Sequence, residues 1–208
     1  MRKIVIPAGY GRLAVLADKA KALYDQHGLK RHNWDHIARN FNRARQILEQ
    51  EPANVEITLA GVLLHDIGYF YGNLKNHAHL GAEQCAGLLF ELGYGKEEVE
   101  AVRHCIEAHD PAGGVLPQTI EAKIVYDADM LDKADLVMIL KGSWADVAEE
   151  FGVSVIEYAE FFISRFEPLL QDGRDYFTRA GRCRDNGNLA AIIDIARRSG
   201  KQNKDFAC

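Results

Sequence analysis

The sequence predicts an all-α protein, a single-domain helical bundle, on three observations. Apolar residues recur at intervals of three and four along most of the 208 residues, the spacing that places them on one face of an α-helix. Alternating apolar and polar runs, which half-buried strands need, are few. Turn-forming residues separate the periodic segments, as at Gly28, at Glu51-Pro52, and at Gly93 with Gly95.

The predicted helices follow the periodic segments in chain order. They cover approximately residues 11–27, 33–50, 54–67, 76–92, 96–109, 117–133, 144–150, 153–171 and 187–199. Gly28 ends the first helix, and Asp110 to Gly114 forms the clearest loop. A chain of this length buries a substantial core as one domain. We therefore predict one domain over residues 1–208, in which the helices of residues 141–208 are added to the same core.

Composition argues against several classes of protein. A net charge of -5 and a pI of about 5.9 do not suit a surface that binds nucleic acid stably. No uncharged apolar run approaches the ~20 residues of a membrane-spanning helix. The four cysteines contain no C-x-x-C pair, which favours reduced thiols. We expect a soluble, cytoplasmic protein without a membrane partner.

One segment stands out because it ends an apolar helix with two ionisable residues. Residues 60–64 are apolar, and His65 and Asp66 follow them just before Gly68. Burying a carboxylate without a partner would be costly. An imidazole and a carboxylate side by side can bind one divalent cation, which would supply the compensating charge. The pair therefore predicts a metal site.

Two ligands hold a metal poorly, so further donors are expected on other helices. His36 borders the apolar stripe of the helix predicted over 33–50. Acidic residues at Asp127, Asp129 and Asp132 interrupt the otherwise apolar helix predicted over 117–133. At least one of these carboxylates should face the interior.

This ordered set of residues resembles the HD superfamily of metal-dependent phosphohydrolases. The resemblance spans approximately residues 30–140, and its specific motifs are residues 64–68 and 127–132. It implies a helical bundle of the HD-domain type, in which one divalent ion is held by a first histidine, both residues of the pair and a late aspartate. In this sequence those residues are His36, His65, Asp66 and Asp129. Asp129 is preferred to Asp127 because the motif of the family aligns at Ala-Asp.

Two further histidine segments bear on a second ion. His77 and His79 precede Leu80-Gly81-Ala82, which resembles the His-x-x-Gly-Ala pattern of family members that bind two ions, and His79 fits it better. Ile106 to His109 matches the Ile-x-x-His pattern of the family, with His104 as the alternative. The resemblance thus implies one or two divalent ions and does not choose among Mn, Fe, Ni, Zn, Co and Mg.

The resemblance implies hydrolysis of a phosphate ester by metal-activated water, with Asp66 as the catalytic carboxylate. The expected partner is a small phosphorylated substrate, such as a nucleotide. Lys75 and Lys133 lie near the ligands in sequence and are expected to bind its phosphate. Two alternatives remain open: a diiron oxygenase, because some HD-fold proteins with six N and O ligands activate oxygen, and a non-catalytic helical module.

Overall fold

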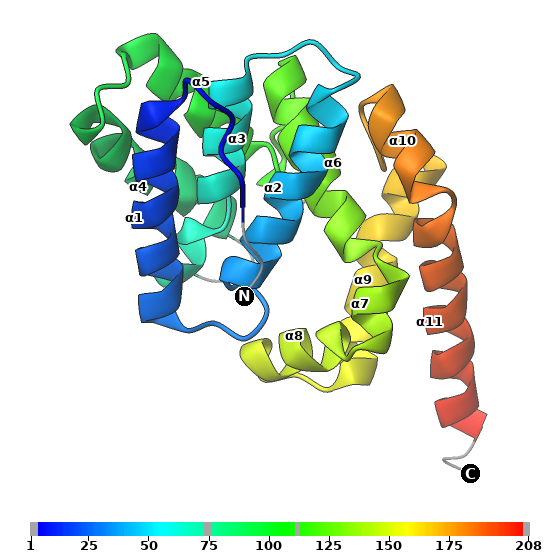
Figure 1. Cartoon of the computed structure of the whole chain (residues 1–208). Helices are drawn as coiled ribbons and strands as arrows, with labels where there is room; N and C mark the ends of the chain where they lie inside the picture. The colour runs from blue at the N-terminus through cyan, green and yellow to red at the C-terminus, as the bar shows by residue number, and fades with distance from the viewer. Residues whose placement is uncertain (1–3, 73–75, 111–112, 206–208) are drawn as a thin grey trace.

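The computed structural model describes residues 4–72, 76–110 and 113–205, and within them the chain forms helices joined by turns, without strands. Figure 1 shows the helices in chain order. Their bounds are α1 Gly11–His27, α2 Trp34–Leu48, α3 Val55–Leu64, η1 (a 3₁₀ helix) Ile67–Phe70, α4 His77–Glu91, α5 Lys96–Glu107, α6 Ile120–Lys133, α7 Leu136–Leu140, α8 Ser143–Phe151, α9 Val155–Gln171, α10 Arg179–Asp185 and α11 Asn188–Asp205. The prediction of an all-α fold is confirmed.

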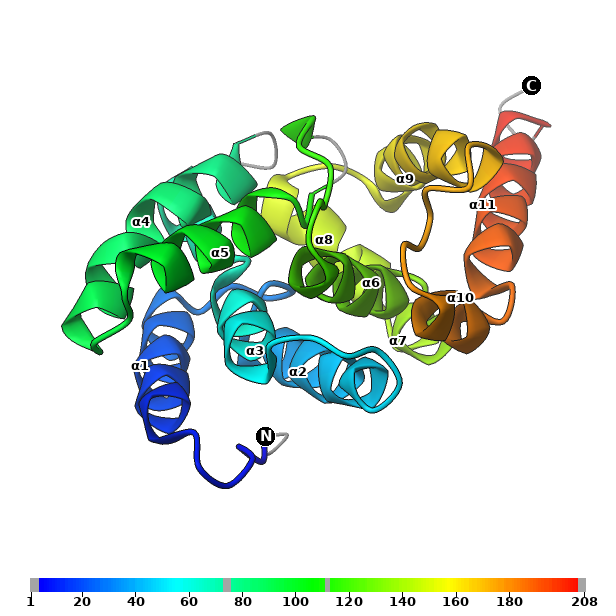
Figure 2. The ribbon, with the colours of Figure 1, turned by 90° about the horizontal axis from the view of Figure 1, so that it is seen from above.

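The helix α3 lies at the centre of the bundle. It contacts α1, α2, α5 and α6, and Figure 2 shows these four helices around it. Every residue of α3 from Ile57 to Leu64 is buried, so no polar side chain is needed on any of its faces. Its first turn is capped by the side-chain oxygen of Asn54, which accepts hydrogen bonds from the backbone N–H groups of Glu56 and Ile57. Because α3 is buried on all sides, the residues that directly follow it also lie in the interior of the protein.

The helices α2 and α6 pack against each other and against α3. In α2 the buried residues Ile37, Phe41, Ala44 and Ile47 form the apolar stripe at helical spacing. Most of the residues of α6, including its three aspartates, are also buried. Buried carboxylates in such a helix require partners from neighbouring elements.

The later helices form a second group along α6. The helix α9 packs against α8 and α11, and α10 packs against α6; Figure 1 shows α9 and α11 side by side. Phe162 and Phe166 of α9 belong to the same buried apolar cluster as the residues of α3. None of the described helices has the length and apolar character needed to cross a bilayer.

The structure differs from the sequence prediction in three short elements. The helices α7 and α10 were not predicted, because five and seven residues are too few for helical periodicity to be recognised. The third predicted helix ends at Leu64 rather than near residue 67, and Ile67–Phe70 continues as the 3₁₀ helix η1. Gly28 ends α1 in the left-handed conformation, as predicted.

Candidate metal centre

The end of α3 places a histidine and an aspartate in the interior. His65 and Asp66 follow Leu64 directly, and both side chains are buried. Nδ1 of His65 lies 2.8 Å from the carbonyl oxygen of Val62. Because a carbonyl only accepts, Nδ1 must carry the proton of the imidazole. Nε2 of His65 is therefore the nitrogen that faces the carboxylate of Asp66.

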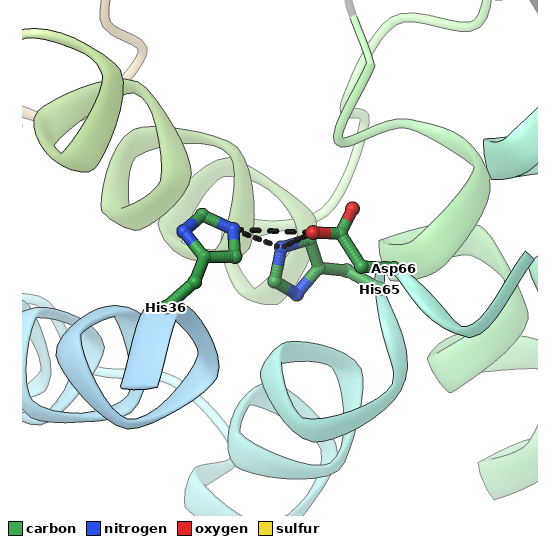
Figure 3. A group of neighbouring side chains, drawn as sticks. All are labelled: His36, His65 and Asp66. Carbon is green, nitrogen blue, oxygen red and sulfur yellow. Dashed lines mark hydrogen bonds and ion pairs between the residues drawn. The ribbon is translucent and has the colours of Figure 1, made fainter. Parts of the chain in front are cut away.

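The helix α2 brings His36 to the same carboxylate. Its Nε2 lies 3.1 Å from Oδ2 of Asp66 and 3.3 Å from Nε2 of His65 (Figure 3). Its other nitrogen, Nδ1, lies 2.8 Å from Oδ2 of Asp132 and donates to it. The backbone N–H of His36 donates to the side-chain oxygen of Asn33, which caps α2. Two imidazole Nε2 atoms thus converge on one oxygen of Asp66.

Asp129 on α6 adds a second carboxylate to this side of the cluster. Its Oδ1 lies 3.4 Å from Nε2 of His36 and 3.8 Å from Nε2 of His65. Asn40 donates from Nδ2 to the same oxygen at 3.2 Å. Oδ2 of Asp129 forms an ion pair with Lys133, one turn further along α6. All four residues of the first predicted ligand set therefore meet in one place.

Asp127 faces away from this cluster. Residues two apart on an α-helix point in nearly opposite directions, and Asp127 accepts hydrogen bonds from the backbone N–H groups of Phe177 and Thr178 at 2.8 and 2.7 Å. The hydroxyl of Thr178 donates to it as well. Burial raises the pKa of Asp127 to about 6, against the opposing effect of these hydrogen bonds. Asp127 attaches the segment before α10 to α6.

Two further histidines face the other oxygen of Asp66. Nε2 of His109, just beyond the end of α5, lies 3.5 Å from Oδ1 of Asp66, and Nε2 of His77, at the start of α4, lies 4.0 Å from it. The two Nε2 atoms are 3.2 Å apart. Nδ1 of His109 donates to the carbonyl of Ile106 at 2.5 Å, as in His65. Each oxygen of Asp66 is thus flanked by a pair of histidines.

The structure places His77, and not His79, beside the cluster. The side chain of His79 is 62% exposed and lies 3.1 Å from Glu107 and 3.5 Å from Glu83, outside the cluster. Two residues apart, the histidines leave α4 in nearly opposite directions, and only His77 faces the interior. The ring of Tyr69 stacks on that of His77, with centroids 4.1 Å apart, which fixes its orientation.

Of the remaining predicted residues, His104 lies outside the cluster. Its Nε2 accepts a hydrogen bond from the backbone N–H of Gln118 at 3.0 Å, so it holds the segment before α6. Lys75, which was predicted to bind substrate, lies outside the described residues. Lys133 lies at the cluster, beside Asp129.

The charges of the cluster influence one another strongly. Burial lowers the pKa of His65, but the negative charges of Asp66 and Asp129 outweigh it and raise that pKa to about 9. Burial lowers the pKa values of His36, His77 and His109 below the usual range. Burial alone would raise the pKa of Asp66, yet the neighbouring histidines hold it well below its usual value. The carboxylate is therefore ionised.

The donor set fits a cation. In their neutral forms, His36 and His65 donate from Nδ1 to Asp132 and Val62, so their unprotonated Nε2 atoms, 3.3 Å apart, are both placed to bind one cation. Oδ2 of Asp66 is buried and receives no well-aligned hydrogen bond from the described residues. Imidazole nitrogens and carboxylate oxygens are ligands of divalent ions. The buried trios His36-His65-Asp66, His65-His109-Asp129 and Asp66-His77-His109 each have donor atoms close enough together to hold such an ion.

Comparison with known proteins identifies the region that contains these residues. Residues 33–134 match the HD domain family. The chain is an HD domain protein. The HD domain extends from the start of α2 to the end of α6, and it contains all four histidines and both aspartates of the cluster.

The chain is also similar in sequence to curated proteins over part of its length. The chain is 31% identical to the protein YpgQ of Bacillus subtilis over 138 residues, which are 63% of this chain and 66% of that protein. It is 25% identical over 144 residues to the 3'-5' exoribonuclease YhaM of Listeria monocytogenes, covering 57% of this chain and 46% of that protein. The chain therefore spans about two thirds of YpgQ and less than half of YhaM.

Solved structures share the fold. The crystal structure of Bacillus subtilis YpgQ in complex with ADP superimposes with a TM-score of 0.65 at 24% identity and covers 92% of this chain and 95% of that chain. A Lactobacillus plantarum structure superimposes with a TM-score of 0.72 at 17% identity and covers 97% and 100% of the two chains. Both likenesses extend beyond the HD domain into the later helices.

A pocket opens onto the cluster. On one side it is lined by the HD domain residues Asp66, Tyr69, His77, Asp129 and Lys133. On the other side it is lined by Val147, Phe151, Tyr158, Phe161, Arg165 and Phe166 of α8 and α9. The helices that follow the HD domain therefore supply the second wall. No sequence motif predicted this wall, because its residues are distant from every motif.

Proposed function

We propose that this chain is a metal-dependent phosphohydrolase that cleaves a small phosphate ester. The observation that carries the proposal is the position of Asp66, with each of its oxygens flanked by a different pair of imidazole Nε2 atoms. A carboxylate in this position suits a bridge between two cations. Two-metal sites of this kind serve phosphatases and nucleases.

The proposed ligands divide into two sets that share Asp66. His36, His65 and Asp129 would hold one ion together with Asp66. His77 and His109 would hold the second together with the same carboxylate. The proposed ligand is His77, whose Nε2 faces the cluster, and not His79, which the family pattern favoured. Divalent ions bound there would supply Lewis acidity and lower the pKa of a coordinated water.

The residues of the chain prepare the site for this chemistry. The carbonyls of Val62 and Ile106 fix the tautomers of His65 and His109, so that their Nε2 lone pairs are available. Lys133 lies beside Asp129 at the pocket wall. Its ammonium group is placed to pair with a phosphate oxygen of the substrate.

A nucleotide is the proposed class of substrate. The aromatic rings of Phe151, Tyr158 and Phe161 line the pocket and offer faces on which a base can stack. YpgQ has been crystallised with ADP, and YhaM is an exoribonuclease. Both relatives therefore act on or bind phosphate groups attached to nucleosides, which supports the same class here.

The proposal is tested by metal analysis and phosphate release with one variant and one control. We expect the purified protein, supplied in turn with Mn, Fe, Co, Ni, Zn or Mg, to release phosphate from members of a nucleotide panel. Asp66→Asn should lose metal and reduce phosphate release to background. Asp25→Asn, the same change at an exposed residue of α1, should alter neither. Absence of turnover by the metal-loaded wild-type protein with any of these ions would contradict the proposal.

Oxygen activation is the second candidate, because four histidines and two carboxylates also suit a pair of irons. The two functions differ in a direct measurement. A diiron oxygenase would purify with iron and consume oxygen in the presence of substrate, whereas the phosphohydrolase proposed here would release phosphate without oxygen consumption.

A further inference from the structure

The helix α9 carries an arginine into the pocket from outside the HD domain. Arg165 lines the pocket together with Asp66 and His77, and its side chain is only 12% exposed. Its Nη2 forms an ion pair with Oδ1 of Asp110, across the space between α9 and the end of α5. A guanidinium group remains charged even when burial lowers its pKa, as it does here. The pocket therefore holds a fixed positive charge.

The position of Asp110 shows on which side of the cluster this charge lies. Asp110 follows His109 directly, and its Oδ2 lies 3.9 Å from Nδ1 of His77. Arg165 is thus on the side of the cluster formed by His77 and His109. Lys133, paired with Asp129, stands on the other side. One cationic side chain accompanies each half of the cluster.

The surroundings of Arg165 orient its side chain but leave donors for a ligand. The guanidinium carbon lies 5.5 and 5.8 Å from the ring centres of Phe161 and Phe166, contacts that support a cation without neutralising it. The ion pair with Asp110 uses Nη2, and a guanidinium group has five N–H donors. Its planar fork matches the oxygens of a phosphate better than a single ammonium group does.

We propose that Arg165 is a substrate-binding residue that holds phosphoryl oxygens of the ester, while Asp110 keeps its guanidinium in place. This inference rests on the proposed function, because it requires a phosphate in the same pocket. It adds that recognition of the phosphate depends on α9 as well as on the HD domain. An ion pair with a purely structural role would stabilise the fold but leave phosphate affinity unchanged.

The test measures anion affinity and metal content separately. Metal-loaded protein is titrated calorimetrically with inorganic phosphate and with the α,β-methylene analogue of ADP, which is not hydrolysed at that bond. We expect Arg165→Met to weaken both affinities by about 10- to 100-fold, the loss expected for a charge-assisted hydrogen bond. Arg165→Lys should recover part of the loss, and metal content should stay at the wild-type value. Arg197→Met removes an exposed arginine of α11 that pairs with Glu167 of α9 and should behave as wild type.

Arg165→Met removes the ion-pair partner that the buried carboxylate of Asp110 has on α9, a change that by itself can prevent folding. The double variant Arg165→Met/Asp110→Asn removes both charges and provides the measurement in that case. The inference about Arg165 would be overturned, and the proposed function left intact, if the folded variant bound the anions with wild-type affinity. It would also be overturned if the loss of affinity were matched by a loss of metal. Failure of the metal-loaded wild-type protein to bind either anion would overturn it together with the proposed function.

Discussion

His36 and Asp132 form a buried hydrogen bond, with Nδ1 of the histidine 2.8 Å from Oδ2 of the aspartate. Asp132 also pairs with Arg31, Arg39 and Arg43. Burial alone would raise its pKa, but the hydrogen bond from His36 and the charge of Arg31 hold that pKa well below the usual range. The carboxylate is ionised and fixed, and it directs Nε2 of His36 toward Asp66.

Asp132→Asn should therefore weaken metal binding. A side chain behind a ligating histidine typically contributes 10- to 100-fold in metal affinity, so we expect a loss of about that size in a competition titration with a chelator. The buried arginines would lose their partner, and the free energy of unfolding should fall by about 3–5 kcal/mol. Both losses are measurable on the same protein, by titration and by urea unfolding.

The matched control is Asp135→Asn. Asp135 pairs with Arg43 as well, but its side chain is 25% exposed, and asparagine can retain its role as the cap of α7. We expect unchanged metal affinity and a stability change below about 1 kcal/mol. Equal metal affinity in the two variants would show that Asp132 does not orient His36.

The two histidines at the start of α4 provide a second matched comparison. His77→Ala should lower the metal content by one ion per chain, because it removes a donor from the His109 side of the cluster. His79→Ala removes an exposed imidazole and should leave the metal content unchanged. Elemental analysis of the two purified variants decides between them. Loss of metal in His79→Ala, with wild-type content in His77→Ala, would reverse the assignment made from the structure.

The same two residues show how far the sequence could predict the site. The apolar run before His65 predicted a buried ionisable pair at residues 65 and 66, and the family resemblance added His36 and Asp129, which the structure places beside Asp66. The prediction of His79 followed a family pattern, although helical spacing along α4 favours His77. Gly81 and Cys85 are buried, and His77 lies on their face of α4, four and eight residues earlier.

Contacts between residues far apart in sequence were beyond the reach of such signals. Asp132 belonged to a recognised motif, but its contact with His36 spans 96 residues. The ion pair of Arg165 with Asp110 likewise depends on how α9 packs beside the HD domain. Periodicity identifies the buried face of a helix and does not identify the helix that covers it.

Metal binding should release about one proton per chain near pH 7.5. In the metal-free protein the pKa of His65 is raised to about 9, whereas those of His36, His77 and His109 are lowered. His65 is then the one histidine of the cluster that is protonated at this pH, and a metal binds only the neutral ring. Apparent affinity should rise by up to about tenfold per pH unit between pH 7 and 9 and then level off.

Calorimetric titration at pH 7.5 in buffers of different ionisation enthalpy measures this proton. The stability of the metal-free protein provides an independent check. Because the folded pKa of His65 exceeds its unfolded value of about 6.5, its contribution is fully present below pH 6.5 and is lost as the pH rises through 9. Metal binding without proton release would contradict the protonation state assigned to His65.

Gly68 sets the distance between η1 and the start of α4. A Cβ atom at this position would lie 1.8 Å from the carbonyl oxygen of His77 and 2.7 Å from the backbone nitrogen of Gly81. Both contacts are with backbone, so the two elements would have to separate. Gly68→Ala should lower the free energy of unfolding by about 1–3 kcal/mol or more, and it should also reduce the metal content, because His77 would move away from Asp66.

Gly87 is the matched control on the same helix. It lies inside α4, and a Cβ atom there would meet nothing within 4 Å. Gly87→Ala should therefore raise the free energy of unfolding by about 0.5–1 kcal/mol, through the higher helix propensity of alanine, and leave the metal content unchanged. Urea unfolding and elemental analysis of the two variants test the pair. If Gly68→Ala were as stable and as rich in metal as Gly87→Ala, the close approach of η1 to α4 would not be what positions His77.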